Sequence, residues 1–260
     1  MIAAMEIVTW NVNSIRARLP RFLPWLEAHR PEVVCLQETK CEDDKFPREP
    51  IEDLGYTIAI DGQRTYNGVA ILSRVGLEDV STGFEGNPDP EQKRAIGATV
   101  GGDTRVLNLY VVNGQAVGSE KFDFKLAWLE ALSRHFEAAY EMNEKVVVVG
   151  DFNITFDDRD VYDADAWREK ILCSTPEREA LARFMQPGLV DALRHFHEEQ
   201  GPYTWWDFRT RGFRRDRGLR IDHVLVSPPA LEVCTGVRVD REARDGEKPS
   251  DHAPVIASFD

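Results

Sequence analysis

Short apolar runs bounded by polar or turn-forming residues recur along most of this chain, which is the pattern of a protein rich in β-strands. We predict strands at Glu6–Trp10, Val33–Leu36, Tyr56–Ile60, Gly68–Leu72, Ile96–Val100, Thr104–Val111, Lys145–Val149, Ile221–Val226 and Pro254–Phe259. The run Val146–Val149 contains no polar residue. Its strand is therefore expected to be buried on both faces.

Helical periodicity is clearest over Glu120–Tyr140, where apolar residues recur at three- and four-residue steps: Phe122, Leu126, Leu129, Leu132, Phe136 and Tyr140. Shorter helices are predicted at Leu19–His29 and Pro176–Phe184, the second with Ser174 or Thr175 as its N-cap. The strands do not alternate regularly with helices. The pattern therefore predicts an α/β fold in which two sheets pack face to face and helices cover their outer sides.

Nothing in the composition divides the chain, which has 260 residues and no repeat, low-complexity tract or linker. We expect one domain over residues 1–260, with Met5 as an alternative start that would make residues 1–4 an extension. There is no apolar stretch of membrane-spanning length and no secretory signal, so we expect no membrane association. The four cysteines form neither a CxxC pair nor a zinc-like spacing, which predicts reduced thiols and a cytoplasmic setting.

The formal net charge of −13 argues at first against a nucleic-acid partner, because phosphate binding calls for a positive surface. The segment Arg209–Arg220 differs from the whole, since it carries six arginines and one acid and follows Trp205, Trp206 and Phe208. A solvated arginine loop would by itself account for the local positive charge. Aromatic rings beside guanidinium groups also give stacking surface and phosphate contacts together, as grooves for nucleic-acid strands do. We favour the groove.

Acidic and amide side chains adjoin the ends of several predicted strands: Asn11, Glu38, Asp151, Asn153, Asp222 and Asp251, with His252 beside the last. Strand ends are where an α/β protein usually builds its reactive edge, because loops there hold polar groups against a ligand. Carboxylates and amides suit a hard divalent cation, and histidine suits general acid–base catalysis. Together they indicate phosphate-ester hydrolysis.

Each of these motifs also has a simpler explanation. The GDFN motif after the valine run could be a turn in which the acid and the amide bind their own backbone. Glu38 could be a surface acid balanced by Lys40. His252 could be a structural histidine. A functional imidazole needs a second carboxylate to orient it. Asp222, at the end of another predicted strand, is the candidate for that carboxylate.

Seven motifs in the order WNxN, QETK, LYxxNG, GDFN, WWDFR, LRIDH and SDHAP resemble the exonuclease III family of apurinic/apyrimidinic endonucleases. That family lies within the wider endonuclease/exonuclease/phosphatase group, and the likeness extends from Glu6 to Phe259. The resemblance implies a four-layer α/β sandwich of two packed, mostly antiparallel sheets flanked by helices. It also implies dependence on Mg²⁺, with Mn²⁺ as a substitute, and action on double-stranded DNA with abasic sites or 3′-blocked ends.

The resemblance further implies roles for the matching residues. Glu38 would be the principal metal ligand, and the other metal-shell residues would be Asn11, Asp151, Asn153 and Asp251. The catalytic residues would be Tyr110, Asp151, Asn153, Asp222 and His252. In this division Asp151 positions or deprotonates water, and Asp222 is paired with His252. The DNA contacts would come from Asn113, Trp205, Trp206 and Arg209.

Two positions depart from the family pattern, since Val112 stands where proline is frequent and Ser14 where glycine is frequent. The expected function is a monomeric DNA-repair phosphodiesterase that cleaves 5′ to abasic sites, with 3′–5′ exonuclease and 3′-end-trimming activity. One alternative is a phosphatase or non-specific nuclease of the same superfamily. Another is a DNA-end-binding module on an inactive scaffold, which is disfavoured because four residues whose loss would signal it are all present: Glu38, Asp151, Asp222 and His252.

Overall fold

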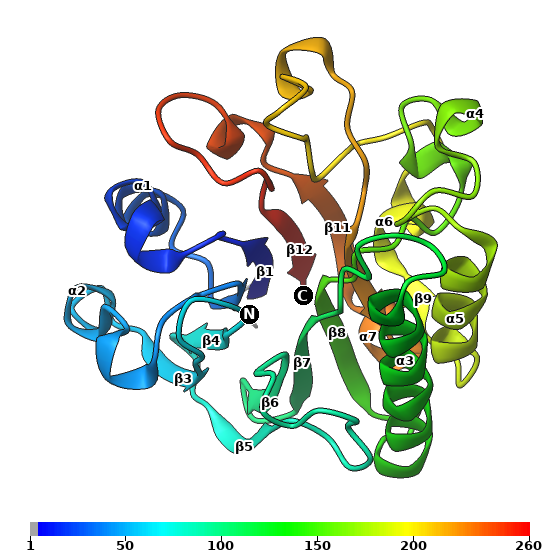
Figure 1. Cartoon of the computed structure of the whole chain (residues 1–260). Coiled ribbons are helices and arrows are strands. Elements are labelled where there is room, and N and C mark those ends of the chain that lie inside the picture. Colours follow the sequence, from blue (N-terminus) through cyan, green and yellow to red (C-terminus); the bar gives the residue numbers. More distant parts are fainter. Residues whose placement is uncertain (1–4) are drawn as a thin grey trace.

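The computed structural model describes residues 5–260 as two six-stranded sheets packed face to face (Figure 1). The first sheet has the order β11-β12-β1-β2-β4-β3 and the second has the order β5-β6-β7-β8-β10-β9. The strands are β1 (Met5–Asn11), β2 (Val33–Gln37), β3 (Thr57–Asp61), β4 (Val69–Ser73), β5 (Glu78–Thr82), β6 (Ala95–Val100), β7 (Thr104–Tyr110), β8 (Lys145–Asp151), β9 (Val190–Asp191), β10 (Asp222–Val226), β11 (Cys234–Val239) and β12 (Val255–Phe259).

Four helices lie on the outer faces of the two sheets, α1 and α2 against the first and α3 and α5 against the second (Figure 1). The helices are α1 (Ile15–His29), α2 (Arg48–Glu52), α3 (Glu120–Ala139), α4 (Ala164–Trp167), α5 (Thr175–Met185), α6 (Ala192–Phe196) and α7 (Pro228–Glu232). This arrangement of helix, sheet, sheet and helix confirms the expected four-layer sandwich.

Each sheet contains one parallel strand pair, β1 with β2 and β7 with β8, while the other pairs of the described chain are antiparallel. α1 connects the first parallel pair and α3 connects the second, so the fold holds two strand–helix–strand units that the pattern analysis did not predict. Parallel strands end at the same edge of a sheet. The carboxyl ends of both pairs are therefore available to build one site.

The valine run of β8 shows how one strand serves two cores. Val147 and Val149 pack in the core between the sheets, while Val146 and Val148 pack in the core beneath α3 and α5. This alternation confirms burial on both faces. The strand then needs Gly150, because a Cβ there would lie 1.9 Å from the carbonyl oxygen of Leu109 on β7.

The predicted strands are all present, with end points that differ by one or two residues, but β5, β9 and β11 were not predicted. Helix α1 begins at Ile15, earlier than expected, and continues through Pro20 and Pro24. Both prolines are exposed and four residues apart, so they share the face that turns away from the core. Helix α5 begins after Ser174, whose capping box with Glu177 confirms the predicted cap.

Among residues 5–260, no helix is both long enough and apolar enough to span a membrane. All four cysteines are buried and free. The expectation that residues 1–4 form an extension lies outside the described residues.

Candidate active site

The two sheets meet in a polar cluster at the carboxyl ends of their parallel strands. Asn11 ends β1, Glu38 follows β2, and Tyr110 and Asp151 end β7 and β8. The side-chain amide of Asn11 donates to Glu38 Oε1 at 2.8 Å and to Asp151 Oδ2 at 2.8 Å. One buried amide therefore joins a carboxylate of the first sheet to a carboxylate of the second.

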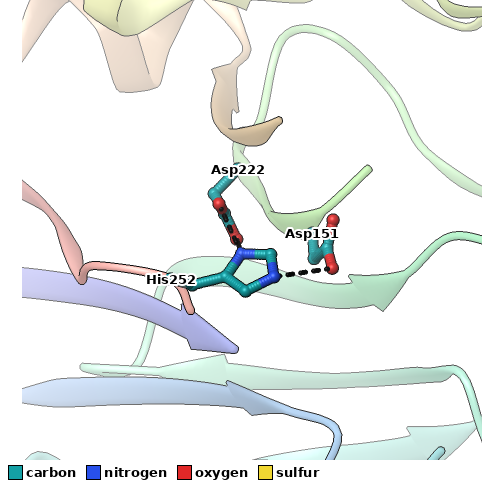
Figure 2. A group of neighbouring side chains, drawn as sticks. All are labelled: Asp151, Asp222 and His252. Carbon is teal, nitrogen blue, oxygen red and sulfur yellow. Dashed lines mark hydrogen bonds and ion pairs between the residues drawn. The ribbon is translucent and has the colours of Figure 1, made fainter. Parts of the chain in front are cut away.

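His252 lies between two carboxylates, as Figure 2 shows. Its Nδ1 is 2.9 Å from Asp222 Oδ2, and its Nε2 is 3.7 Å from Asp151 Oδ2. The two acids are brought together by the antiparallel pairing of β8 with β10, in which Asp222 faces Asp151 directly. The second carboxylate that a functional histidine requires is thus present.

The surroundings change the proton affinity of this group. Burial raises the pKa of Asp151 to about 7, against the opposing effect of the His252 imidazolium. Burial alone would lower the pKa of His252, but the carboxylates of Asp222 and Asp151 outweigh it and raise that pKa to about 10. His252 is therefore protonated at neutral pH, with Nδ1–H bonded to Asp222 and Nε2 at ion-pair distance from Asp151.

Asp151, Asp222 and His252 each offer an atom within 4.8 Å of the others, which is close enough to hold a metal ion. A protonated imidazole has no lone pair to give, so we favour oxygen donors instead. Glu38 and Asp151, which share the Asn11 amide, are the carboxylates that fit a hard cation. Lys40 Nζ also lies 2.6 Å from Glu38 Oε2. The Glu38–Lys40 ion pair, which was the simpler explanation for Glu38, is therefore present together with the Asn11 contact.

Asn153 is hydrogen-bonded directly to Asp151, whereas Asp251 is connected to this pair of carboxylates only through Asn13 and Asn11. The backbone N–H of Asn153 donates to Asp151 Oδ1 at 2.9 Å, and its Oδ1 accepts from Asn113 Nδ2 at 2.8 Å. Asp251 accepts from Asn13 Nδ2 at 2.9 Å, and the Asn13 backbone N–H donates to Asn11 Oδ1 at 2.9 Å. The structure thus links the expected metal-shell residues through hydrogen bonds.

Tyr110 is 9% exposed at the same edge. Burial, followed by the nearby carboxylates of Glu38 and Asp151, raises the pKa of the Tyr110 phenol well above its ordinary value, so the phenol keeps its proton. Arg94 packs over the ring at 4.6 Å and donates to the Tyr110 carbonyl oxygen at 3.2 Å. Sequence reasoning missed Arg94. Its position two residues before the predicted strand Ile96–Val100 was the available signal.

The aromatic and arginine-rich loop borders the site through Trp205, whose indole N–H donates to Asp251 Oδ2 at 3.0 Å. Arg209 is exposed, as a phosphate contact requires. The expectation that Trp206 faces DNA needs correction, because this ring is only 1% exposed. It packs against Phe213 and beneath Arg241, so it supports the loop from inside.

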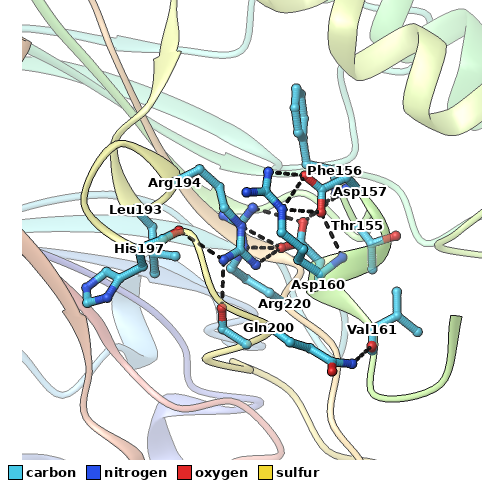
Figure 3. Close-up of polar contacts among 12 residues, drawn as sticks. Thr155, Phe156, Asp157, Asp160, Val161, Leu193, Arg194, His197, Gln200 and Arg220 are labelled. Atoms are coloured by element: carbon cyan, nitrogen blue, oxygen red, sulfur yellow. Dashed lines mark hydrogen bonds and ion pairs between the residues drawn. The ribbon is translucent and has the colours of Figure 1, made fainter.

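A buried ionic cluster holds the start of β10 (Figure 3). Arg220 donates to Asp160 at 2.7 Å and to Asp191 at 2.7 Å, and Arg194 also pairs with Asp160. Arg220 lies two residues before Asp222, so this cluster fixes the chain from which the histidine's partner projects. Sequence reasoning had assigned this arginine to the nucleic-acid-binding run, but its side chain is 0% exposed.

A search against protein-family models matches residues 8–252 to the endonuclease/exonuclease/phosphatase family. The chain belongs to this family. An exodeoxyribonuclease III from Haemophilus influenzae is 35% identical, with coverage of 98% of this chain and 100% of that protein. The chain is accordingly a hydrolase of the exodeoxyribonuclease III type.

Solved structures of this family superpose closely on the fold. A 3′ phosphatase from Neisseria bound to product DNA hairpin is 46% identical and has a TM-score of 0.94, with coverage of 98% of this chain and 99% of that chain. An AP endonuclease from Archaeoglobus fulgidus is 38% identical and also has a TM-score of 0.94, with the same coverage.

Proposed function

We propose that this protein is a Mg²⁺-dependent DNA-repair phosphodiesterase that cleaves DNA 5′ to abasic sites and trims 3′ ends. The observation that carries the proposal is the His252 imidazole held between Asp222 and Asp151, with Asp151 joined to Glu38 through Asn11. The Asp151 carboxylate thereby lies beside the His252 imidazole and is joined to a second carboxylate, that of Glu38, so one place offers a proton acceptor, a cation and oxygen donors for a metal. Hydrolysis of a phosphate ester needs these three components.

In this proposal, Asp151 takes a proton from the attacking water, because its buried carboxylate lies at the end of β8 beside the His252 imidazole. His252, oriented by Asp222, presents positive charge to the phosphate oxygens, and the protonated phenol of Tyr110 donates a hydrogen bond to them. Asn153 would hold a further phosphate oxygen. Mg²⁺, held by Glu38 with the neighbouring carboxylates, would supply the charge that stabilises the leaving oxygen.

The names of the relatives support DNA as the substrate, because exodeoxyribonuclease, AP endonuclease and 3′ phosphatase all describe action on DNA. In this chain, Trp205 and Arg209 lie on the loop that borders the site, and Asn113 is exposed beside Asn153. These three are the proposed DNA contacts. We also propose that residues 1–260 form one domain that acts as a monomer in the cytoplasm.

The 46% identity to a 3′ phosphatase supports a second candidate function, in which the enzyme removes 3′ phosphates and does not incise abasic DNA. Three end-labelled duplexes separate the two functions: one with a single tetrahydrofuran abasic analogue, one with a 3′-phosphate at a nick, and one intact. Each is incubated with Mg²⁺, with Mn²⁺ or with chelator.

We expect incision 5′ to the analogue and release of the 3′-phosphate, both requiring the metal. Removal of the 3′-phosphate alone would establish the second candidate, and cleavage of all three duplexes at equal rates would indicate a non-specific nuclease. The Glu38→Ala variant should need more Mg²⁺ for the same rate. An unchanged Mg²⁺ requirement in that variant would remove Glu38 from the metal site.

A further inference from the structure

Lys125 is a lysine inside the hydrophobic face of α3. It lies on the stripe that contains Phe122 and Leu129, both buried against the second sheet, and its own side chain is 0% exposed. Burial of an ammonium group costs free energy unless charged and polar partners compensate. The partners of Lys125 therefore show what the residue is for.

The Lys125 ammonium lies directly behind two site residues. Its Nζ donates to the carbonyl oxygen of Asn153 at 2.7 Å and to the carbonyl oxygen of Asn113 at 3.3 Å. The side chains of these two asparagines are hydrogen-bonded to each other at 2.8 Å. Asn153 has a φ of 51°, a left-handed conformation that asparagine adopts more readily than most other residues.

The third partner of the ammonium is Glu177 at the start of α5, which is also 0% exposed. Glu177 accepts from the backbone N–H groups of Leu172 and Ser174, each at 3.1 Å, and from the Ser174 hydroxyl at 2.6 Å. The ion pair therefore connects α3 and α5 to the two loops that carry Asn113 and Asn153.

A buried ion pair is weak support for stability, because apolar residues of similar volume often stabilise a core equally well. Its more specific effect is to fix geometry. We propose that Lys125, compensated by Glu177, is a positioning residue that holds the Asn113–Asn153 amide pair at the phosphate-binding edge. This inference rests on the proposed function, in which Asn153 holds a phosphate oxygen.

The test is the double variant Lys125→Met/Glu177→Gln, which removes both charges and keeps an acceptor oxygen for the Ser174 N–H. We expect it to fold and to keep its KM for abasic duplex close to that of the wild type. Its kcat should fall by about 10-fold to 100-fold, the scale of a small misplacement of a reacting group. Amide hydrogen exchange at Asn153 should accelerate relative to the amides of α3.

Leu132→Ala, on the same face of α3 and two helical turns beyond Lys125, is the matched control, because it destabilises the core and leaves the ion pair in place. It should retain wild-type kcat and relative exchange at Asn153. The proposal is overturned if the double variant keeps wild-type kcat and exchange, or if the control loses as much kcat. If the wild type cleaves no DNA, the proposed function fails, and the exchange comparison still decides the role of Lys125.

Discussion

At the scale of single residues, the proposed chemistry depends on how closely the His252 ring approaches each of two carboxylates. Asp222 makes the shorter contact, at 2.9 Å, and Asp151 the longer one, at 3.7 Å. The shorter contact orients the ring, and the longer one leaves Asp151 free to exchange a proton with water. In the proposed mechanism the three side chains therefore act as one unit, so that replacing one of them also impairs the other two.

This coupling is measurable with a double-mutant cycle. Asp222→Ala and His252→Ala should each lower kcat by about 10²-fold or more, the scale of a positioned acid–base group. The double variant should be little worse than either single one, because each change breaks the same contact. Steady-state kinetics on the abasic duplex measure the three rates. Multiplicative losses would show that the two residues work separately.

Ser14 offers a prediction about stability. It caps α1 by accepting from the Ala17 N–H, yet it has φ 85° and ψ 104°, where a Cβ is strained. We expect Ser14→Gly to raise the free energy of unfolding by about 1 kcal/mol, since strain of this kind costs about 1–3 kcal/mol and glycine loses only a few tenths as a cap. Denaturant unfolding measures the change. Ser14→Ala, which keeps the strain and loses the cap, should destabilise.

The sequence predicted the site residues that are acids, amides or histidines next to apolar strands, such as Asp222 and His252. It was less informative where burial decides the role. Trp206 reads as a DNA contact from its neighbours, but it is buried beneath Arg241. Lys125 reads as a surface lysine, although its position on the stripe of Phe122 and Leu129 would have indicated burial.

At the scale of secondary-structure elements, a buried amide pair ties the two sheets together just behind the site. Gln37 on β2 donates to Asn108 Oδ1 on β7 at 2.6 Å, and Asn108 donates back to the carbonyl oxygens of Leu36 and Ala70, each at 2.9 Å. Gln37 precedes Glu38, and Asn108 lies two residues before Tyr110. The bridge therefore sets how the two halves of the site face each other.

Asn108→Leu removes this bridge at nearly constant volume. We expect a loss of about 1–3 kcal/mol in the free energy of unfolding from the unpaired groups left behind, together with a fall in kcat as the sheets shift. Val106→Ala, on the same strand and in the same inter-sheet core, is the control for destabilisation alone. Denaturant unfolding and turnover are measured for both. If the two variants have the same kcat, the Gln37–Asn108 bridge does not position the site.

Strands were predictable where both faces are buried and less so at the sheet edges. β5 is exposed along its length and has acids among its residues, so its hydrophobic signal is weak. β11 carries polar residues and a bulge between Cys234 and Gly236. Edge strands owe their existence to a neighbouring strand, a tertiary effect that local composition does not contain.

At the scale of the whole molecule, an acidic protein presents arginines beside its site. Arg209→Ala should lower kcat/KM on abasic and intact duplex together and flatten its dependence on salt, because one phosphate contact is lost.

Trp205→Ala should instead reduce the preference for abasic DNA, by about 1–3 kcal/mol for a lost stacking surface. Both are measured over a salt series. An equal loss on both substrates for Trp205→Ala would make this ring a packing residue.

The buried cluster around Arg220 predicts how acid affects the fold. Burial alone would raise the pKa of Asp160, but the Arg220 guanidinium outweighs it and holds that pKa well below its ordinary value. A carboxyl with a lowered folded pKa stabilises the protein above its unfolded pKa of about 4, and this contribution is lost as the pH falls below that value.

Asp160→Asn should therefore cost about 3–5 kcal/mol of stability at pH 7, and the difference from the wild type should shrink below about pH 4. Asp165→Asn is the control, because Asp165 is an exposed acid with a surface partner. Unfolding free energies across this pH range test the prediction. A difference that stays constant as the pH falls would show that the charge of Asp160 contributes little.

The site combines residues from both ends of the described chain, since Asn11 is on the first strand and His252 lies just before the last one. A ribosome that has not yet released residue 252 holds a chain that lacks the imidazole, however much of the fold has formed. In the proposed mechanism, a copy that stops before residue 252 is therefore inactive.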